Sequence, residues 1–296
     1  MHYDIRHPDF EAIITPGATL NRLATGYAFV EGPAWHPQQG HLTFSDIAGD
    51  TMYRWAPGDD APQVLRRPSH KANGNTYDAK GRLLTCEHAT SRVVRQEADG
   101  ALTVLASHHG DKALNSPNDI IVLRDGTIWF TDPLAGRKPF FGVPRPQELD
   151  FQGVWRLRPG ADAPEPVATD FELPNGLCTD PDETLLYVND TPRGHIRRFG
   201  LAADGTLSGG AEFARLTGEG EGVPDGLKTD TEGRVWCTGP GGVHVFAPDG
   251  TPLGVIRIPE KTANFTWMGE DRRTLVTTSS TSLYTLPVMA RGHHLF

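Results

Sequence analysis

The chain has 296 residues, and its 28 Lys and Arg against 37 Asp and Glu give a formal net charge of −9 at pH 7. A hydrophobic content of 38% and a mean hydropathy of −0.40 exclude a membrane-embedded protein, since no run approaches the roughly 18 apolar residues of a spanning helix. The acidic balance argues against nucleic acid as a partner, because phosphate binding requires a basic face.

The N-terminal residues 1–10 are polar and contain no apolar signal core. We therefore expect a cytoplasmic protein, although a processed secreted protein could look the same. The three cysteines, Cys86, Cys178 and Cys237, are too few and too far apart for a disulfide framework or a thiolate metal cage. We expect them to be buried thiols.

The 33 Gly and 24 Pro are spread evenly along the chain, which is typical of many short strands separated by turns. One phrase recurs in chain order: a turn residue, one or two variable positions, and alternating apolar residues that end in a small polar or acidic one. The copies are residues 40–46, 81–87, 126–132, 183–190, 233–238 and a degenerate 273–278.

Each copy is followed by a second strand-like segment and preceded by another. The segments that follow are residues 52–55, 92–95, 154–157, 196–199, 243–246 and 283–286. Four antiparallel strands per copy, in six copies, predict an all-β, six-bladed β-propeller. No fourth strand follows the last copy, so we expect residues 19–24 to supply it and close the ring. The whole chain, 1–296, is then one domain, and we expect a monomer or a weak dimer.

Alignment of the copies places a polar residue at the start of every innermost strand. The six residues are Glu31, Asn73, Asn118, Asn175, Asp225 and Asn264. Because these strand ends face the propeller axis, we expect the side chains to converge at one rim. For any single copy, Asn-Gly or Asp-Gly is also an ordinary turn dipeptide. Together, converging carboxylates and amides favour a bound hard cation, Ca²⁺ before Mg²⁺.

Four motifs make the sequence similar to a known family. They are Glu31-Gly32-Pro33, Ser116-Pro117-Asn118-Asp119, Pro174-Asn175-Gly176 and Pro224-Asp225-Gly226. They resemble the gluconolactonase and regucalcin (senescence marker protein) family, in the same order and over nearly the whole chain. Residues 72–95, with Asn73-Gly74 and Cys86-Glu87-His88, look most like its bacterial gluconolactonase branch.

The resemblance implies one divalent metal ion bound by Glu31, Asn175 and Asp225, with Asn118 beside it in contact with metal or substrate. Ca²⁺ is favoured, while Zn²⁺, Mn²⁺ and Mg²⁺ remain alternatives. This chain has Ser116 two residues before Asn118. Some members of the family carry an Arg at the position of Ser116. We expect the short Ser116 side chain to leave space and to favour a neutral sugar lactone.

Lactone hydrolysis needs a polarised carbonyl group and an activated water molecule, and a divalent ion can act as the Lewis acid. Asp225 is the candidate catalytic residue, either as general base or as nucleophile. Asn118, Asn73 and His88 are candidate substrate-binding residues, although His88 could instead be a surface histidine. Two other function classes stay open: a non-catalytic metal- or partner-binding propeller, and a promiscuous ester or organophosphate hydrolase.

Other catalytic motifs are missing from the sequence, including a Gly-x-Ser-x-Gly elbow and His-Glu-x-x-His. The pairs His108-His109 and His293-His294 are expected to be exposed. An insertion, residues 133–151, separates the second and third strands of blade three. Its Lys138, Phe140, Phe141 and Arg145 favour a lid or wall of a substrate cleft, with a plain surface loop as the alternative.

Overall fold

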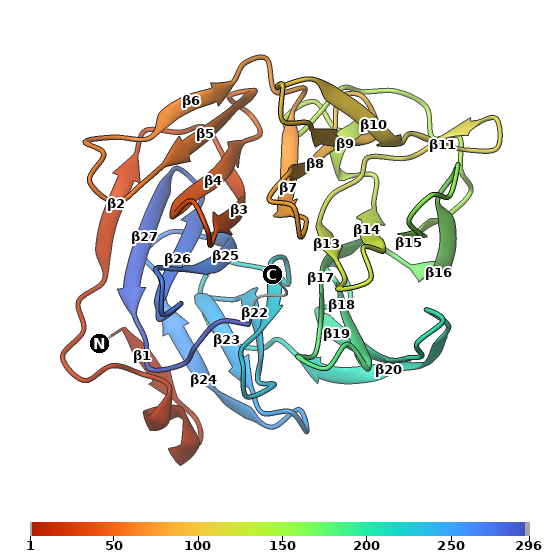
Figure 1. The fold of residues 1–296 in the computed structure, drawn as a ribbon. Coiled ribbons are helices and arrows are strands. Elements are labelled where there is room, and N and C mark those ends of the chain that lie inside the picture. The colour runs from red at the N-terminus through yellow and green to blue at the C-terminus, as the bar shows by residue number, and fades with distance from the viewer. Residues whose placement is uncertain (1, 294–296) are drawn as a thin grey trace.

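The computed structural model describes residues 2–293, and this part of the chain forms six antiparallel sheets arranged around a common axis (Figure 1). Each sheet has at least four strands, which confirms the predicted six-bladed propeller. In every blade the strand nearest the axis comes first in the sequence, apart from the N-terminal strands that join blades five and six.

The blades follow one another along the chain. Blade one contains β3 (Val30–His36), β4 (His41–Asp46), β5 (Thr51–Trp55) and β6 (Gln63–Arg66). Blade two contains β7 (Ala72–Tyr77), β8 (Leu83–Glu87), β9 (Arg92–Gln96) and β10 (Leu102–Ala106). Blade three contains β13 (Ile120–Val122), β14 (Ile128–Asp132), β15 (Gln152–Leu157) and β16 (Glu165–Phe171). Blade four contains β17 (Pro174–Thr179), β18 (Leu185–Asp190), β19 (His195–Leu201) and β20 (Leu207–Arg215).

The N-terminal segment completes the last two blades. Blade five contains β21 (Leu227–Thr229), β22 (Val235–Gly239), β23 (Gly242–Phe246) and β24 (Pro252–Arg257), and blade six contains β25 (Thr262–Met268), β26 (Thr274–Ser279) and β27 (Ser282–Pro287). The strand β2 (Asn21–Thr25) pairs with β27 and closes the ring as predicted. A fifth strand on blade five, β1 (Tyr3–Ile5) paired with β24, was not predicted.

The repeated phrase has a local conformational cause. Its turn residue has a positive φ in the first five copies, and in the degenerate sixth copy the residue directly before it, Arg272, has this conformation. Only two of these six residues are not glycine. The residues are Gly40 (63°), Gly81 (71°), Gly126 (85°), Glu183 (57°), Gly233 (75°) and Arg272 (55°). Because glycine adopts this left-handed conformation without steric cost, it marks the tight turn into the second strand of most blades.

Apolar side chains fill the space between neighbouring blades. One cluster joins Trp129 and Val154 of blade three to Leu177, Leu186 and Val188 of blade four, all of them buried. Another cluster lies between blades five and six, and it also takes up Phe10 from the 3-10 helix η1 (Pro8–Ala12). The three cysteines are free and buried, as expected.

The connections between strands carry the remaining elements. The insertion 133–151 joins β14 to β15 as predicted and contains a short 3-10 helix, η2 (Ala135–Arg137). A small hairpin of β11 (His108–His109) and β12 (Lys112–Ala113) leaves both histidines exposed, as expected. His293 is instead partly buried, with its backbone N–H 3.1 Å from the Thr229 carbonyl oxygen, and His294 lies outside the described residues.

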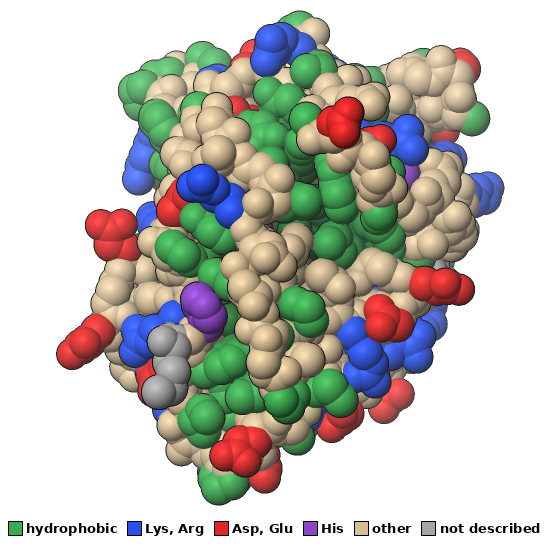
Figure 2. Space-filling model, turned by 90° about the vertical axis from the view of Figure 1, so that its left-hand side faces the viewer, with side chains coloured by type: hydrophobic (Ala, Val, Ile, Leu, Met, Phe, Trp, Pro, Cys, Tyr) green, Lys and Arg blue, Asp and Glu red, His purple; other side chains and the backbone are tan. Residues whose placement is uncertain are grey.

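The surface carries charges of both signs. On the face shown in Figure 2, Lys and Arg side chains are interspersed with Asp and Glu, and they do not merge into a basic area. Neither helical segment among residues 2–293 is long and apolar enough to span a membrane.

Candidate active site

Five of the six predicted ring residues meet at a cavity of about 160 Å³ at one end of the propeller axis. Glu31, Asn73 and Asn175 are the second residues of β3, β7 and β17, while Asn118 and Asp225 lie two residues before β13 and β21. All five line the cavity, and so does His88, which follows β8 directly. The structure thus brings together every residue that the sequence marked as catalytic, metal-binding or substrate-binding.

In blades one, three and four, the acidic residue that ends the repeated phrase holds the segment before the ring residue. In blade one, Asp46 accepts hydrogen bonds from the backbone N–H groups of residues 28 and 29, at 3.0 and 2.9 Å. Asp132 accepts from residues 115 and 116, at 2.8 and 2.7 Å, and Asp190 accepts from residues 172 and 173, at 2.9 and 3.1 Å. In each blade these donors lie three and two positions before the ring residue, so one carboxylate fixes its approach to the axis.

The polar residue before that acid fixes the backbone of the next blade. Ser45 donates to the carbonyl oxygen of Asn73 at 2.8 Å, and Thr131 donates to that of Asn175 at 2.7 Å. In the same way the Asn189 amide donates to the Asp225 carbonyl oxygen at 2.6 Å. The ring is therefore connected from blade to blade through side-chain to backbone hydrogen bonds.

Gly74 and Gly176, which follow the ring residues Asn73 and Asn175, are needed for close approach rather than for turns. A Cβ atom at Gly74 would lie 2.4 Å from the carbonyl oxygen of Asn118, and one at Gly176 would lie 2.0 Å from that of Asp225. Neither glycine has a positive φ. Any side chain there would push the next ring residue away, so the turn-dipeptide interpretation of these Asn-Gly pairs is wrong.

Glu31 and Asp225 form a pair of neighbouring carboxyl groups. Burial is the main cause that raises the pKa of Glu31 to about 7, while hydrogen bonds from Gly32 and Asn264 oppose the rise. Burial and the adjacent Glu31 charge also raise the pKa of Asp225 well above its usual value, and the positive charge of Lys261 lowers it. Two carboxylates in such surroundings ionise together only when a cation compensates them.

The ring amides are oriented with their oxygens available to a cation. The Asn175 amide nitrogen donates to Thr191 Oγ1 at 3.1 Å, and the Asn73 amide nitrogen donates to His88 Nε2 at 3.1 Å. Both amides also line the cavity, so the acceptor oxygen is the atom left for a ligand. Two carboxylates with amide oxygens form an oxygen-only donor set, which fits Ca²⁺.

The possible metal ligands at the ring are two carboxylates and several amide oxygens, not a cluster of acidic residues and histidines. Among residues 2–293, no group of three or more His, Cys, Asp or Glu side chains is placed to hold a metal ion. The sixth ring residue, Asn264, does not line the cavity; its amide nitrogen donates to Glu31 Oε2 at 3.0 Å. Asn264 therefore orients Glu31 rather than adding another ligand.

His88 is buried at the cavity wall, not on the surface. Its Nδ1 lies 2.9 Å from the carbonyl oxygen of Phe141, so Nδ1 carries the proton and Nε2 accepts from Asn73. Burial lowers the pKa of His88 to about 4, although the hydrogen bond to Phe141 opposes this shift. His88 is neutral at physiological pH and connects the ring to the insertion.

The insertion 133–151 forms one wall of the cavity. Lys138 and Phe141 line the cavity, and the Phe141 ring contacts Phe29 edge-on with 5.1 Å between ring centroids. Arg145 does not line it: its guanidinium donates to the His88 carbonyl oxygen at 2.7 Å and holds the insertion in place. Phe140 is 53% exposed, and its ring contacts Phe29 edge-on with 6.2 Å between ring centroids.

The expectation that Ser116 leaves space beside Asn118 is wrong. Ser116 is fully buried, and its hydroxyl donates to the Pro133 carbonyl oxygen and accepts from the Gly136 backbone N–H at 2.9 Å. The insertion fills the position: a Cβ at Gly136 would lie 2.7 Å from that of Ser116. Position 116 is thus closed to substrate.

Sequence analysis missed several cavity residues, of which Lys261 carries a charge. It lies directly before β25, three positions before Asn264. The corresponding positions in the other copies hold Ala28, His70 and other residues without a shared chemical type. The one sequence signal for Lys261 is its position directly before an innermost strand.

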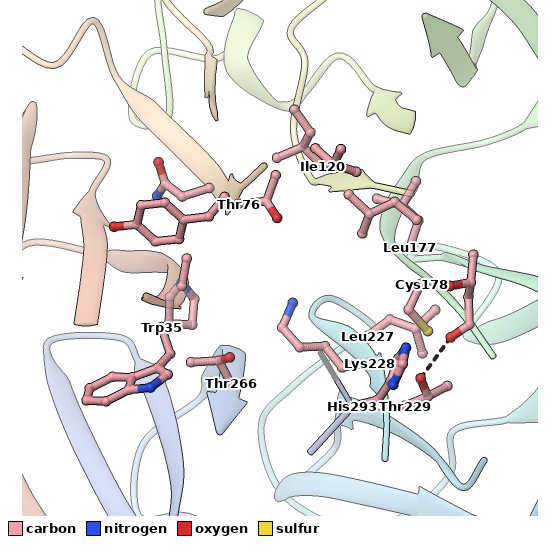
Figure 3. A pocket seen from close by; sticks show the side chains of 17 residues that line it. Trp35, Thr76, Ile120, Leu177, Cys178, Leu227, Lys228, Thr229, Thr266 and His293 are labelled. Carbon is pink, nitrogen blue, oxygen red and sulfur yellow. Dashed lines mark hydrogen bonds between the residues drawn. The ribbon is translucent and has the colours of Figure 1, made fainter. Parts of the chain in front are cut away.

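A second cavity of about 110 Å³ lies further along the same innermost strands (Figure 3). Its lining contains no Asp or Glu, and Lys228 points into it. Burial raises the pKa of the neighbouring Asp119, and the positive charge of Lys228 lowers it. Unlike the cavity at the ring, this one offers no carboxylate for metal binding.

Comparison with known proteins identifies the family. Residues 29–281 match the family described as the SMP-30/Gluconolactonase/LRE-like region, which includes every ring residue. The chain belongs to this family. Among SMP-30/gluconolactonase/LRE-like relatives, the gluconolactonase of Zymomonas mobilis is 28% identical over 270 residues, covering 84% of this chain and 75% of the relative. The 6-deoxy-6-sulfogluconolactonase of Pseudomonas putida is 30% identical over 259 residues, covering 84% and 82%.

A solved structure of the SMP-30/gluconolactonase/LRE-like fold agrees with this assignment. The gluconolactonase of Xanthomonas campestris has a TM-score of 0.90 and 37% identity, covering 97% of this chain and 95% of that one. The resemblance inferred from the four sequence motifs is therefore confirmed.

Proposed function

We propose that this lactonase opens a sugar lactone to the aldonic acid at the 160 Å³ cavity, using a divalent ion held by Glu31, Asn175 and Asp225. The observation that carries the proposal is the pair of adjacent carboxyl groups, Glu31 and Asp225, at a cavity where amide oxygens are free to accept a cation. Ca²⁺ fits this oxygen donor set best. When bound, the ion polarises the lactone carbonyl group as a Lewis acid.

Asp225 acts as the general base toward the attacking water. The two carboxylates differ in availability, because Glu31 Oε2 accepts hydrogen bonds from Gly32 at 2.5 Å and from Asn264 at 3.0 Å. Within residues 2–293, the Asp225 carboxyl group has no hydrogen-bond partner other than the carboxyl group of Glu31. Asp225 is also the more open of the two toward the cavity. It can therefore take a proton from water while Glu31 stays fixed.

Asn118 and Asn73 bind the substrate ring, and His88, whose two ring nitrogens are already paired, forms part of the cavity wall and orients Asn73. The Asn118 side chain makes no hydrogen bond with another described residue, so both of its polar atoms are available to substrate hydroxyls. The cavity is smaller than the ~300–1,000 Å³ of drug-sized binding sites and suits a single sugar ring. The relatives are named for gluconolactone and for its 6-deoxy-6-sulfo derivative, which also contain one ring.

The proposal is tested by comparing substrates of different classes in a pH-stat. D-Glucono-1,5-lactone, p-nitrophenyl acetate and a phosphate triester are assayed at pH 7.5, each with and without a chelator, after subtraction of spontaneous hydrolysis. We expect rapid, chelator-sensitive opening of the lactone and rates at least about tenfold lower for the other two. A faster ester or triester reaction would favour the promiscuous hydrolase, and no turnover of any substrate would favour a binding propeller.

A further inference from the structure

Two lysines from different blades line the catalytic cavity without a partner. Lys138 belongs to the insertion of blade three, and Lys261 directly precedes β25 of blade six. Within residues 2–293, neither ammonium group donates a hydrogen bond or lies in an ion pair. The insertion contacts Phe29 of blade one, the neighbour of blade six, which brings Lys138 over the same cavity as Lys261.

The other charges at this end of the axis can balance one another. A divalent ion offsets Glu31 and Asp225, and the Lys228 charge acts on Asp119 from the second cavity, into which it points (Figure 3). With the ion bound, the cavity holds two carboxylates against the ion, Lys138 and Lys261, so the two lysine charges are in excess. A positively charged, partly enclosed cavity attracts an anionic ligand.

We infer that the substrate is a lactone that carries an anionic substituent, a phosphate or sulfonate, on a carbon away from the ester, and that Lys138 and Lys261 bind this group. The inference rests on the proposed function and specifies its substrate class. It replaces the expectation of a neutral lactone, which depended on space at Ser116 that the insertion fills. The lysines bind but do not react, so their removal affects the charged substrate selectively.

The test compares kcat/KM for D-glucono-1,5-lactone and its 6-phosphate in the parent, Lys261→Gln and Lys138→Gln. Lys80→Gln is the matched control, because Lys80 is exposed and lies outside the cavity. We expect the parent to prefer the phosphorylated lactone by about tenfold or more. Each cavity variant should lose about tenfold more on the phosphorylated lactone than on the neutral one, so that any effect of the Lys261 charge on Asp225, which both substrates share, cancels in the comparison. A parent that prefers the neutral lactone, or variants that lose equally on both, would overturn the inference.

A binding measurement separates this inference from the proposed function. The dissociation constants of 6-phosphogluconate and gluconate are measured by calorimetry for the same four proteins. Tighter binding of the phosphorylated acid, weakened in Lys261→Gln and Lys138→Gln but not in Lys80→Gln, supports the anion subsite even if neither lactone is hydrolysed. Equal affinity of the parent for the two acids would overturn it even if both lactones are hydrolysed.

Discussion

Asp225 is a ring residue whose carboxylate faces the cavity rather than the blade that carries it. Its backbone carbonyl oxygen is fixed by Asn189, while its carboxylate faces Glu31 and the cavity. Replacement by Asn keeps an oxygen that can ligate the ion and removes the proton acceptor. We expect Asp225→Asn to retain the ion and to lower kcat by about 10²-fold or more. The variant is checked by lactone assay together with metal analysis, and near-parental kcat with metal bound would remove Asp225 from the mechanism.

His88 makes stability depend on pH in a definite direction. Its pKa is about 4 in the folded chain and 6.5 in an unfolded one, so as pH falls the unfolded state takes up the proton first. The contribution of His88 to the free energy of unfolding is therefore complete above about pH 6.5 and is lost progressively down to about pH 4. The neutral form is required because Nδ1 donates to Phe141 while Nε2 accepts from Asn73.

Lowering the pH from 7.5 to 4.5 should decrease the free energy of unfolding of both the parent and His88→Gln. We expect this decrease to be about 2 kcal/mol smaller in His88→Gln than in the parent. Denaturant unfolding at the two pH values measures this difference. His109→Gln is the control, since His109 is exposed on β11. Equal losses in the parent and in His88→Gln would show that His88 is not held in its neutral form.

At the scale of single residues, the sequence predicts which residues lie in the ring better than it predicts the contacts that their side chains make. Glu31 and Asp225 could be found because each occupies the same place in its repeat copy. The contacts of Ser116 and Arg145 could not, since they depend on how the insertion folds back onto blade two and blade three. Such packing has no periodic signature in the sequence.

The repeated phrase is the element that builds the site. In blades one, three and four, the polar residue of the phrase holds the backbone of the next blade, and the acid that follows holds the backbone of its own blade. The sequence predicted the strands from this phrase, but it did not reveal the purpose of the acid. The acid accepts its hydrogen bonds only in the folded blade, where the segment before the ring residue lies against the end of the second strand.

We expect Asp190→Ala to lower the free energy of unfolding by about 2–4 kcal/mol, because two backbone N–H groups lose a charged acceptor. It should also weaken ion binding, since residues 172 and 173 lead directly to Asn175. Asp162→Ala is the control, because Asp162 is exposed. Chemical unfolding and calcium calorimetry measure the two effects. Parental values for both would show that this carboxylate does not position the ring.

On the scale of the whole molecule, the two N-terminal strands have different roles. The strand β2 supplies the outer strand of blade six and closes the ring, whereas β1 adds a fifth strand to the already complete blade five. The closing strand was predictable because the last repeat copy lacks a fourth strand. The three-residue β1 is too short to give an alternating pattern.

Removal of residues 1–26 should therefore lower the melting temperature by at least about 10 °C or make the protein insoluble, because it exposes the edge of β27 and removes the buried Phe10. Removal of residues 1–7 should cost only a few degrees. Thermal unfolding monitored by circular dichroism compares the two truncations with the full chain. Equal melting temperatures would contradict ring closure by β2.

The central claim is that the ring holds one catalytic divalent ion in a fold that stands without it. The direct measurement is a calcium titration of metal-free full-length protein, with lactone hydrolysis followed in a pH-stat and the fold followed by circular dichroism. The account predicts no activity without the ion, a rise to a plateau at one ion per chain, and a spectrum that stays the same throughout. Full activity of the metal-free protein, or an unfolded metal-free chain, would contradict it.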